Sequence, residues 1–177
     1  ATQTLVSMVS SQKWGMDDRA QLVISFKMIE TLETVLRRLH FSEDRIRAYV
    51  SSIVDVATYG PDPLDPYLVL CGEERFAMSH VEDAGVLATA FGAQADILVT
   101  DNLRDFATKD ASVVDTQVVN TTSSGQRPLL ALRYEIGSAD LIVAHPFDVM
   151  QWLRLGYDFT PHTLWNAIQK PGDEPHI

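Results

Sequence analysis

Residues with oxygen-bearing side chains mark two junctions in the stretch from Ser79 to Phe106. These are Asp83 at the first junction and Asp101, Asn102 and Asp105 at the second. Carboxylate and amide oxygens are ligands that hard divalent cations such as Mg²⁺ prefer in proteins. Brought to one place by the fold, side chains of these types would form a divalent metal site.

The residues between the two junctions predict a helix followed by a buried strand. Ser79 and Glu82 have the spacing of a capping box, and apolar residues then recur at helical spacing up to Gly92, the expected left-handed terminator. Residues 97–100, Ile-Leu-Val-Thr, are typical of a strand buried in a parallel sheet. A helix of about twelve residues and a strand of about five have similar lengths, so we expect Asp83 to return to the edge where the strand ends.

The convergence of the set distinguishes a metal site from ordinary capping. Taken singly, each residue is better explained by the helix dipole or by turn formation, since Asp and Glu favour first helical turns and Asp-Asn favours turns. Open α/β sheets, however, bind their ligands at the carboxyl ends of the strands. Because all four residues are expected at that edge, the sequence predicts a divalent metal site there.

The rest of the chain predicts further helices and strands. Helices that begin after Ser25 and Ser42 carry apolar stripes and are expected to pair as a hairpin. Strands are expected at residues 21–25, 67–71, 113–119, 129–136 and 141–144. A polar turn over residues 120–126 predicts a β-hairpin insertion at about 110–138, and C-terminal helices are expected at about 147–169.

This alternation predicts a single α/β domain over residues 1–177, with three layers, α/β/α, around a mainly parallel central sheet. Trp152 and Trp165 fall on helical apolar faces and are expected to pack in the core. His145 lies at the carboxyl end of an expected strand, which is the edge suited to function. Pro146 beside it makes a structural role in the turn the simpler interpretation.

Composition and charge restrict the class of protein. The chain has 177 residues and 46% hydrophobic content, which suits one domain with a sizeable core, and no apolar run approaches the roughly 20 residues of a membrane span. Its single cysteine, Cys71, cannot form an internal disulfide, which suits the cytoplasm. The net charge of -10 argues against non-specific duplex binding, although local basic residues remain available to hold a nucleic-acid strand. These are Arg37, Arg38, Arg45 and Arg47.

Two blocks of residues share their spacing with a known family. The first is Leu22-Val-Ile-Ser25 leading into Leu32-x-x-Val35-Leu36-Arg37-Arg38. The second and more specific block is Glu82-Asp83-x-x-Val86-Leu87-x-x-Ala90-x-x-x-x-Ala95-Asp96-Ile97-Leu98-Val99-Thr100-x-Asn102-x-x-Asp105-Phe106. On these blocks the chain resembles PIN-domain proteins, in the branch that includes toxin components of bacterial toxin-antitoxin pairs.

The resemblance implies a metal-dependent endoribonuclease with a PIN-like fold. In such proteins a cluster of acids binds Mg²⁺ or Mn²⁺, and the ion activates water for attack on an RNA phosphodiester. By this resemblance the catalytic residues are Asp83, Asp101 and Asp105. The implied metal ligands are these three acids together with Asn102 and Glu30, and the implied substrate-binding residues are Thr100 and Arg104. The implied partners are an RNA substrate, an antitoxin protein and a second copy of the chain.

Two functions remain open at this point. Ala1, Thr31 and Asn102 occupy positions where the family prefers acids, which favours a PIN scaffold that no longer cleaves and acts as a protein- or RNA-binding module. Glu33 is expected to form a surface pair with Arg37 rather than to bind metal. A generic phosphate-binding protein is disfavoured, since the sequence has no glycine-rich phosphate loop.

Overall fold

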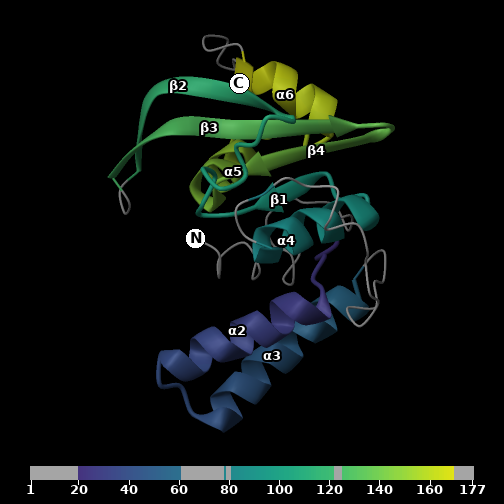
Figure 1. Ribbon diagram of the computed structural model, residues 1–177, viewed down its shortest axis with the longest axis vertical. Coiled ribbons are helices and arrows are strands. Elements are labelled where there is room, and N and C mark those ends of the chain that lie inside the picture. Colours follow the sequence, from purple (N-terminus) through teal and green to yellow (C-terminus); the bar gives the residue numbers. More distant parts are fainter. Residues whose placement is uncertain (1–19, 61–77, 79–80, 122–124, 170–177) are drawn as a thin grey trace. The chain divides into compact units, whose positions relative to one another are not determined.

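The computed structural model describes residues 20–60, 78, 81–121 and 125–169 (Figure 1). The chain divides into two compact units, one within residues 2–71 and one within residues 72–177. We call their described parts the helical unit, residues 20–60, and the sheet unit, which comprises residues 78, 81–121 and 125–169. The strand expected at 67–71 lies outside the described residues.

The helical unit is a hairpin of α2 (Phe26–Arg38) and α3 (Glu43–Thr58), as the sequence predicts (Figure 1). Ser25 caps α2, because its side-chain oxygen accepts a hydrogen bond from the amide of Met28 at 3.4 Å. The helix ends in a Schellman motif, with His40 in the left-handed region at φ 61°. This left-handed residue directs the chain back into α3.

The prediction of a strand at residues 21–25 is wrong, since these residues form no helix or strand. Valine and isoleucine favour strands only where a neighbouring strand supplies ladder hydrogen bonds, and the described helical unit contains no strand. The segment is attached to α3 instead. The Gln21 side-chain amide donates to the carbonyl of Ala57 at 2.8 Å.

The sheet unit contains the remaining described elements. These are α4 (Val81–Gly92), β1 (Ile97–Val99), β2 (Ala111–Thr121), β3 (Gly125–Ile136), β4 (Ala139–Ala144), α5 (Pro146–Arg154) and α6 (Pro161–Gln169). The strands form one four-stranded sheet in the order β1-β4-β3-β2, visible in Figure 1. The α/β class is therefore confirmed, and the hairpin strands expected near 113–119 and 129–136 are present as β2 and β3.

The expectation of a mainly parallel sheet is wrong. Among the described strands, β1 and β4 alone pair in parallel, whereas β4–β3 and β3–β2 are antiparallel. Short connections cause this, because a tight turn can join only antiparallel neighbours and a parallel pair needs a long crossover. Gly137, at φ 63°, lies in the turn between β3 and β4.

The turn between α4 and β1 also differs from expectation. Gly92 is the last residue of α4, and the left-handed residue is Gln94, at φ 53°. The amides of Gln94 and Ala95 donate to the carbonyls of Phe91 and Ala90, which completes a Schellman motif. Gly156, just after the end of α5, is also in the left-handed region, at φ 71°.

Alternate residues of the strands pack against different helices. Leu132, Tyr134, Leu141 and Val143 form a core cluster with Leu87 and Ala90 of α4. The intervening residue Arg133 contacts α6 instead. Helices α4 and α6 therefore lie on opposite faces of the sheet. Trp152 and Trp165 are 5% and 6% exposed, which confirms their predicted packing roles.

Tyr134 connects the core to the segment that follows β1. Its hydroxyl donates to the carbonyl of Phe106 and lies 3.0 Å from the Thr108 hydroxyl. Burial raises the pKa of the Tyr134 phenol above its usual value of 10.0, so the group stays protonated and remains a donor. Leu103 and Phe106 are buried in the same cluster and fix the segment from within.

Arg133 holds the other face of the sheet to α6. Its guanidinium donates to both carboxylate oxygens of Asp140, at 2.8 and 2.7 Å, and also contacts Glu135 at 2.9 Å. The same group lies 6.0 Å from the ring centre of Trp165 and 3.4 Å from His162 Nδ1 on α6. The hydrogen bonds to Asp140 raise the pKa of Arg133, so the buried guanidinium remains charged.

None of the helices in the described ranges is long and apolar enough to cross a membrane.

We predict that Tyr134→Phe destabilises the sheet unit. The substitution removes the contacts of the Tyr134 hydroxyl with the Phe106 carbonyl and the Thr108 hydroxyl, while the Thr108 amide still donates to that carbonyl. The loss should cost about 1 kcal/mol. Urea unfolding monitored by circular dichroism measures the change. Tyr157→Phe is the control, because Tyr157 is a half-buried tyrosine of the same unit and its substitution should change stability by less than about 0.5 kcal/mol. Equal stability of Tyr134→Phe and the wild type would contradict the anchoring role.

We also predict unequal effects at the two carboxylates that contact Arg133. The Asp140 side chain is 28% exposed and the Glu135 side chain 62%, so water replaces the lost partner far better at Glu135. Asp140→Asn should cost about 2–3 kcal/mol of unfolding free energy, and Glu135→Gln less than about 0.5 kcal/mol. The same urea titrations measure both. A larger loss in Glu135→Gln would show that the pair with Asp140 is not the dominant one.

Candidate functional site

The parallel pair of β1 and β4 brings two polar residues together where both strands end. The amide of Thr100 donates to the carbonyl of Ala144 at 3.0 Å, which extends the ladder one residue beyond β1. The residue after Thr100 and the residue after Ala144 therefore lie next to each other. These residues are Asp101 and His145, whose Oδ1 and Nε2 atoms lie 3.5 Å apart.

His145 also begins helix α5. Its Nδ1 accepts a hydrogen bond from the amide of Phe147 at 3.2 Å, so the imidazole is the N-cap of the helix, and Pro146 follows at the first helical position. The structural role predicted for His145 is thus confirmed. The same ring presents its second nitrogen to Asp101, which places His145 at the carboxyl edge of the sheet as well.

The acidic turn after β1 is ordered by local hydrogen bonds. The amide of Asn102 donates to the Thr100 hydroxyl at 3.1 Å, and the Asn102 side-chain amide donates to the carboxylate of Asp105. Leu103 lies between them and is 5% exposed. Asp101, Asn102 and Arg104 are exposed, so burial of the apolar residues turns the polar side chains outward.

Asp83 and Asp148 occupy first helical turns of the sheet unit. Asp83 lies in the first turn of α4, which packs on the sheet and is joined to β1 by the short turn at 93–96. Strand β1 has three residues and is shorter than the twelve-residue α4, so the convergence of Asp83 with the acidic turn stays a prediction. Asp148, in the first turn of α5, is 5% exposed and was not predicted as a site residue. The sequence signal for Asp148 is its position shortly after a buried strand and three residues after His145.

Glu30 lies on α2 in the helical unit. Its carboxylate is exposed and lies 3.8 Å from the ammonium group of Lys27. Glu33 forms the predicted pair with Arg37, at 3.1 Å, and Glu43 contacts the same guanidinium at 3.0 Å. Both carboxylates raise the pKa of Arg37, with the Glu43 hydrogen bond as the largest cause.

The donor chemistry at the carboxyl edge suits a hard cation. Within the described ranges, no group of three or more His, Cys, Asp or Glu side chains is arranged to hold a metal ion. In the conformation described, Asp101 faces His145 and Asp105 accepts from Asn102. The exposed oxygens of these residues are nevertheless of the type that Mg²⁺ and Mn²⁺ bind, and both carboxylates lie on one anchored turn.

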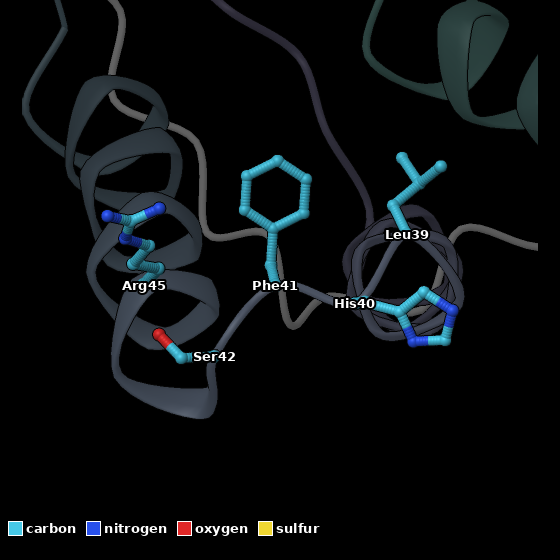
Figure 2. A pocket seen from close by; sticks show the side chains of 5 residues that line it. All are labelled: Leu39, His40, Phe41, Ser42 and Arg45. Carbon is cyan, nitrogen blue, oxygen red and sulfur yellow. The ribbon is translucent and has the colours of Figure 1, made fainter.

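An open hollow lies on the turn between α2 and α3. Figure 2 shows His40 and Arg45 on opposite sides of it, with Phe41 between them. Leu39 and Ser42 complete its lining. The hollow belongs to the helical unit. Its lining includes Arg45, one of the basic residues available to hold a nucleic-acid strand, and none of the predicted metal ligands.

Comparison with protein-family models, curated proteins and solved structures finds no significant match for this chain.

Proposed function

We propose that this protein is a metal-dependent endoribonuclease with a three-layer PIN-like fold. The observation that carries the proposal is made at the carboxyl edge of the β1–β4 pair. There Asp101 lies beside His145, and Asp101 and Asp105 are on the same turn after β1. Helices on opposite faces of the sheet are compatible with the three-layer arrangement. In the proposal, Asp83 in the first turn of α4 supplies a third carboxylate.

In this proposal Asp83, Asp101 and Asp105 hold one or two Mg²⁺ or Mn²⁺ ions. The bound ion supplies the activation of water and the stabilisation of the leaving oxygen at an RNA phosphodiester. Asp105 would exchange its present contact with Asn102 for the ion, and Asp101 would offer the ion one carboxylate oxygen. The chain's own task would be to hold the carboxylates together although they repel one another. Burial of Leu103 and Phe106 anchors the turn that carries two of them, Asp101 and Asp105.

Residues near the acids serve the substrate. Arg104 is exposed on the same turn and can neutralise a phosphate of the RNA strand. The Thr100 hydroxyl orders the turn by accepting from the Asn102 amide, and its own proton remains available for a donor role. The cytoplasmic location, antitoxin partner and homodimer belong to the proposal through the sequence resemblance alone.

A PIN scaffold that binds protein or RNA without cleaving it is the second candidate. One observation favours it: Asp101 and Asp105 each contact a neighbouring side chain, and Asn102 stands where an acid is preferred. Binding of Mn²⁺ separates the two candidates. Calorimetry at millimolar Mn²⁺ should detect a site if the protein is a nuclease, and heat of dilution alone would favour the scaffold.

We predict that Asp83→Asn lowers Mn²⁺-dependent cleavage of single-stranded RNA by at least about 100-fold, because the ion loses an anionic ligand. Cleavage of an end-labelled RNA measures the rate, and added EDTA should stop it. Glu82→Gln is the matched control, since Glu82 is an exposed acid in the same helical turn. It should cleave at the wild-type rate.

The fold must be unchanged for this comparison to hold. Circular dichroism of Asp83→Asn and Glu82→Gln should match the wild type. Equal cleavage by Asp83→Asn and the wild type would remove Asp83 from the mechanism. Cleavage that persists in EDTA would contradict the metal dependence itself.

A further inference from the structure

His145 occupies a position that the proposed chemistry does not yet use. It follows β4 directly, and Asp101 follows β1 with one residue between, so the parallel ladder fixes their backbones beside each other. The two side chains come from residues far apart in sequence. Their contact therefore depends on the pairing of β1 with β4 and exists only in the folded protein.

The hydrogen bonding of the ring defines which nitrogen carries the proton. Nδ1 accepts from the amide of Phe147, so in the neutral ring Nδ1 has no hydrogen and Nε2 carries it. Nε2 is the atom that faces Asp101 Oδ1, at 3.5 Å. The ring therefore presents an N–H donor to a carboxylate that is a candidate metal ligand.

The exposures of the two side chains differ sharply. The His145 side chain is 8% exposed and the Asp101 side chain 78%, so a buried ring lies next to an exposed carboxylate. A separation of 3.5 Å is longer than a good hydrogen bond, about 2.7–3.2 Å. Rotation of the exposed carboxylate can shorten it, whereas the ring is held by packing and by its bond to Phe147.

We propose that His145 is a positioning residue that holds Asp101 in the orientation required for Mn²⁺ or Mg²⁺ binding. The inference rests on the proposed nuclease function and assigns to its site a residue outside the acid set. The Nε2–H group binds one carboxylate oxygen and leaves the other for the ion. Residues that hydrogen-bond a metal ligand in this way commonly change metal affinity about 10–100-fold when replaced.

Two substitutions separate this role from helix capping. Asn places a side-chain oxygen near the position of Nδ1, so His145→Asn keeps the cap of α5 but cannot reach Asp101. Gln carries its amide at the distance of Nε2, so His145→Gln keeps a donor for Asp101 but loses the cap. We expect His145→Asn to weaken Mn²⁺ binding about 10–100-fold by calorimetry, and His145→Gln to bind within about threefold of the wild type.

A double substitution tests whether His145 acts through Asp101. Asp101→Asn weakens Mn²⁺ binding by itself, and adding His145→Asn should cause no further loss, because the residue that His145 positions is already changed. A residue that only maintains the fold would produce additive losses. Urea unfolding provides the second readout, with a lower midpoint expected for His145→Gln than for His145→Asn.

The outcomes separate this inference from the proposed function. Wild-type affinity in His145→Asn, or additive losses in the double variant, would overturn the positioning role while the metal site stands. If the wild-type protein binds no Mn²⁺ at millimolar concentration, the proposed function fails, and the positioning role fails with it. Weakened binding in His145→Asn, retained binding in His145→Gln and no further loss in the double variant support the inference.

Discussion

The parallel pairing of β1 with β4 is the constraint on which the candidate site depends. It is the only parallel pair among the described strands, and it aligns the ends of two segments that are distant in sequence. The hydrogen bond from Thr100 to Ala144 fixes the register at the edge itself. A shift of one residue would turn alternate side chains to the opposite face and separate Asp101 from His145.

The core beneath this edge determines how rigid the acidic turn is. Like charges on one short turn repel, so the turn needs attachment that does not depend on the acids. Leu103 and Phe106 are buried against the sheet, and Tyr134 hydrogen-bonds the backbone from β3. The antiparallel hairpin therefore serves the site from a distance, because it carries the tyrosine that holds the turn in place.

Local periodicity in the sequence predicts the helices and strands. Contacts between residues that are distant in sequence could not be predicted from it. Helix α4, strand β1 and the acidic turn follow from capping, apolar spacing and β-branched residues. The sequence did not predict that residues 21–25 lack a strand partner, that Gln94 takes the left-handed position, or that His145 reaches Asp101. Each of these depends on which segments meet in the fold. His145 could be assigned to the correct edge from sequence, but its contact could not.

The tautomer of His145 bears on why a histidine suits this place. A lysine or arginine beneath Asp101 would also donate to its carboxylate, but its positive charge would oppose a divalent cation bound a few ångströms away. A neutral imidazole whose Nδ1 accepts from the Phe147 amide can donate from Nε2, which lies 3.5 Å from Asp101 Oδ1, without adding charge. In the positioning role proposed for His145, the start of α5 fixes which ring nitrogen carries the proton, and the ring orients the carboxylate. The start of α5 and the end of β1 thereby act as one structural unit.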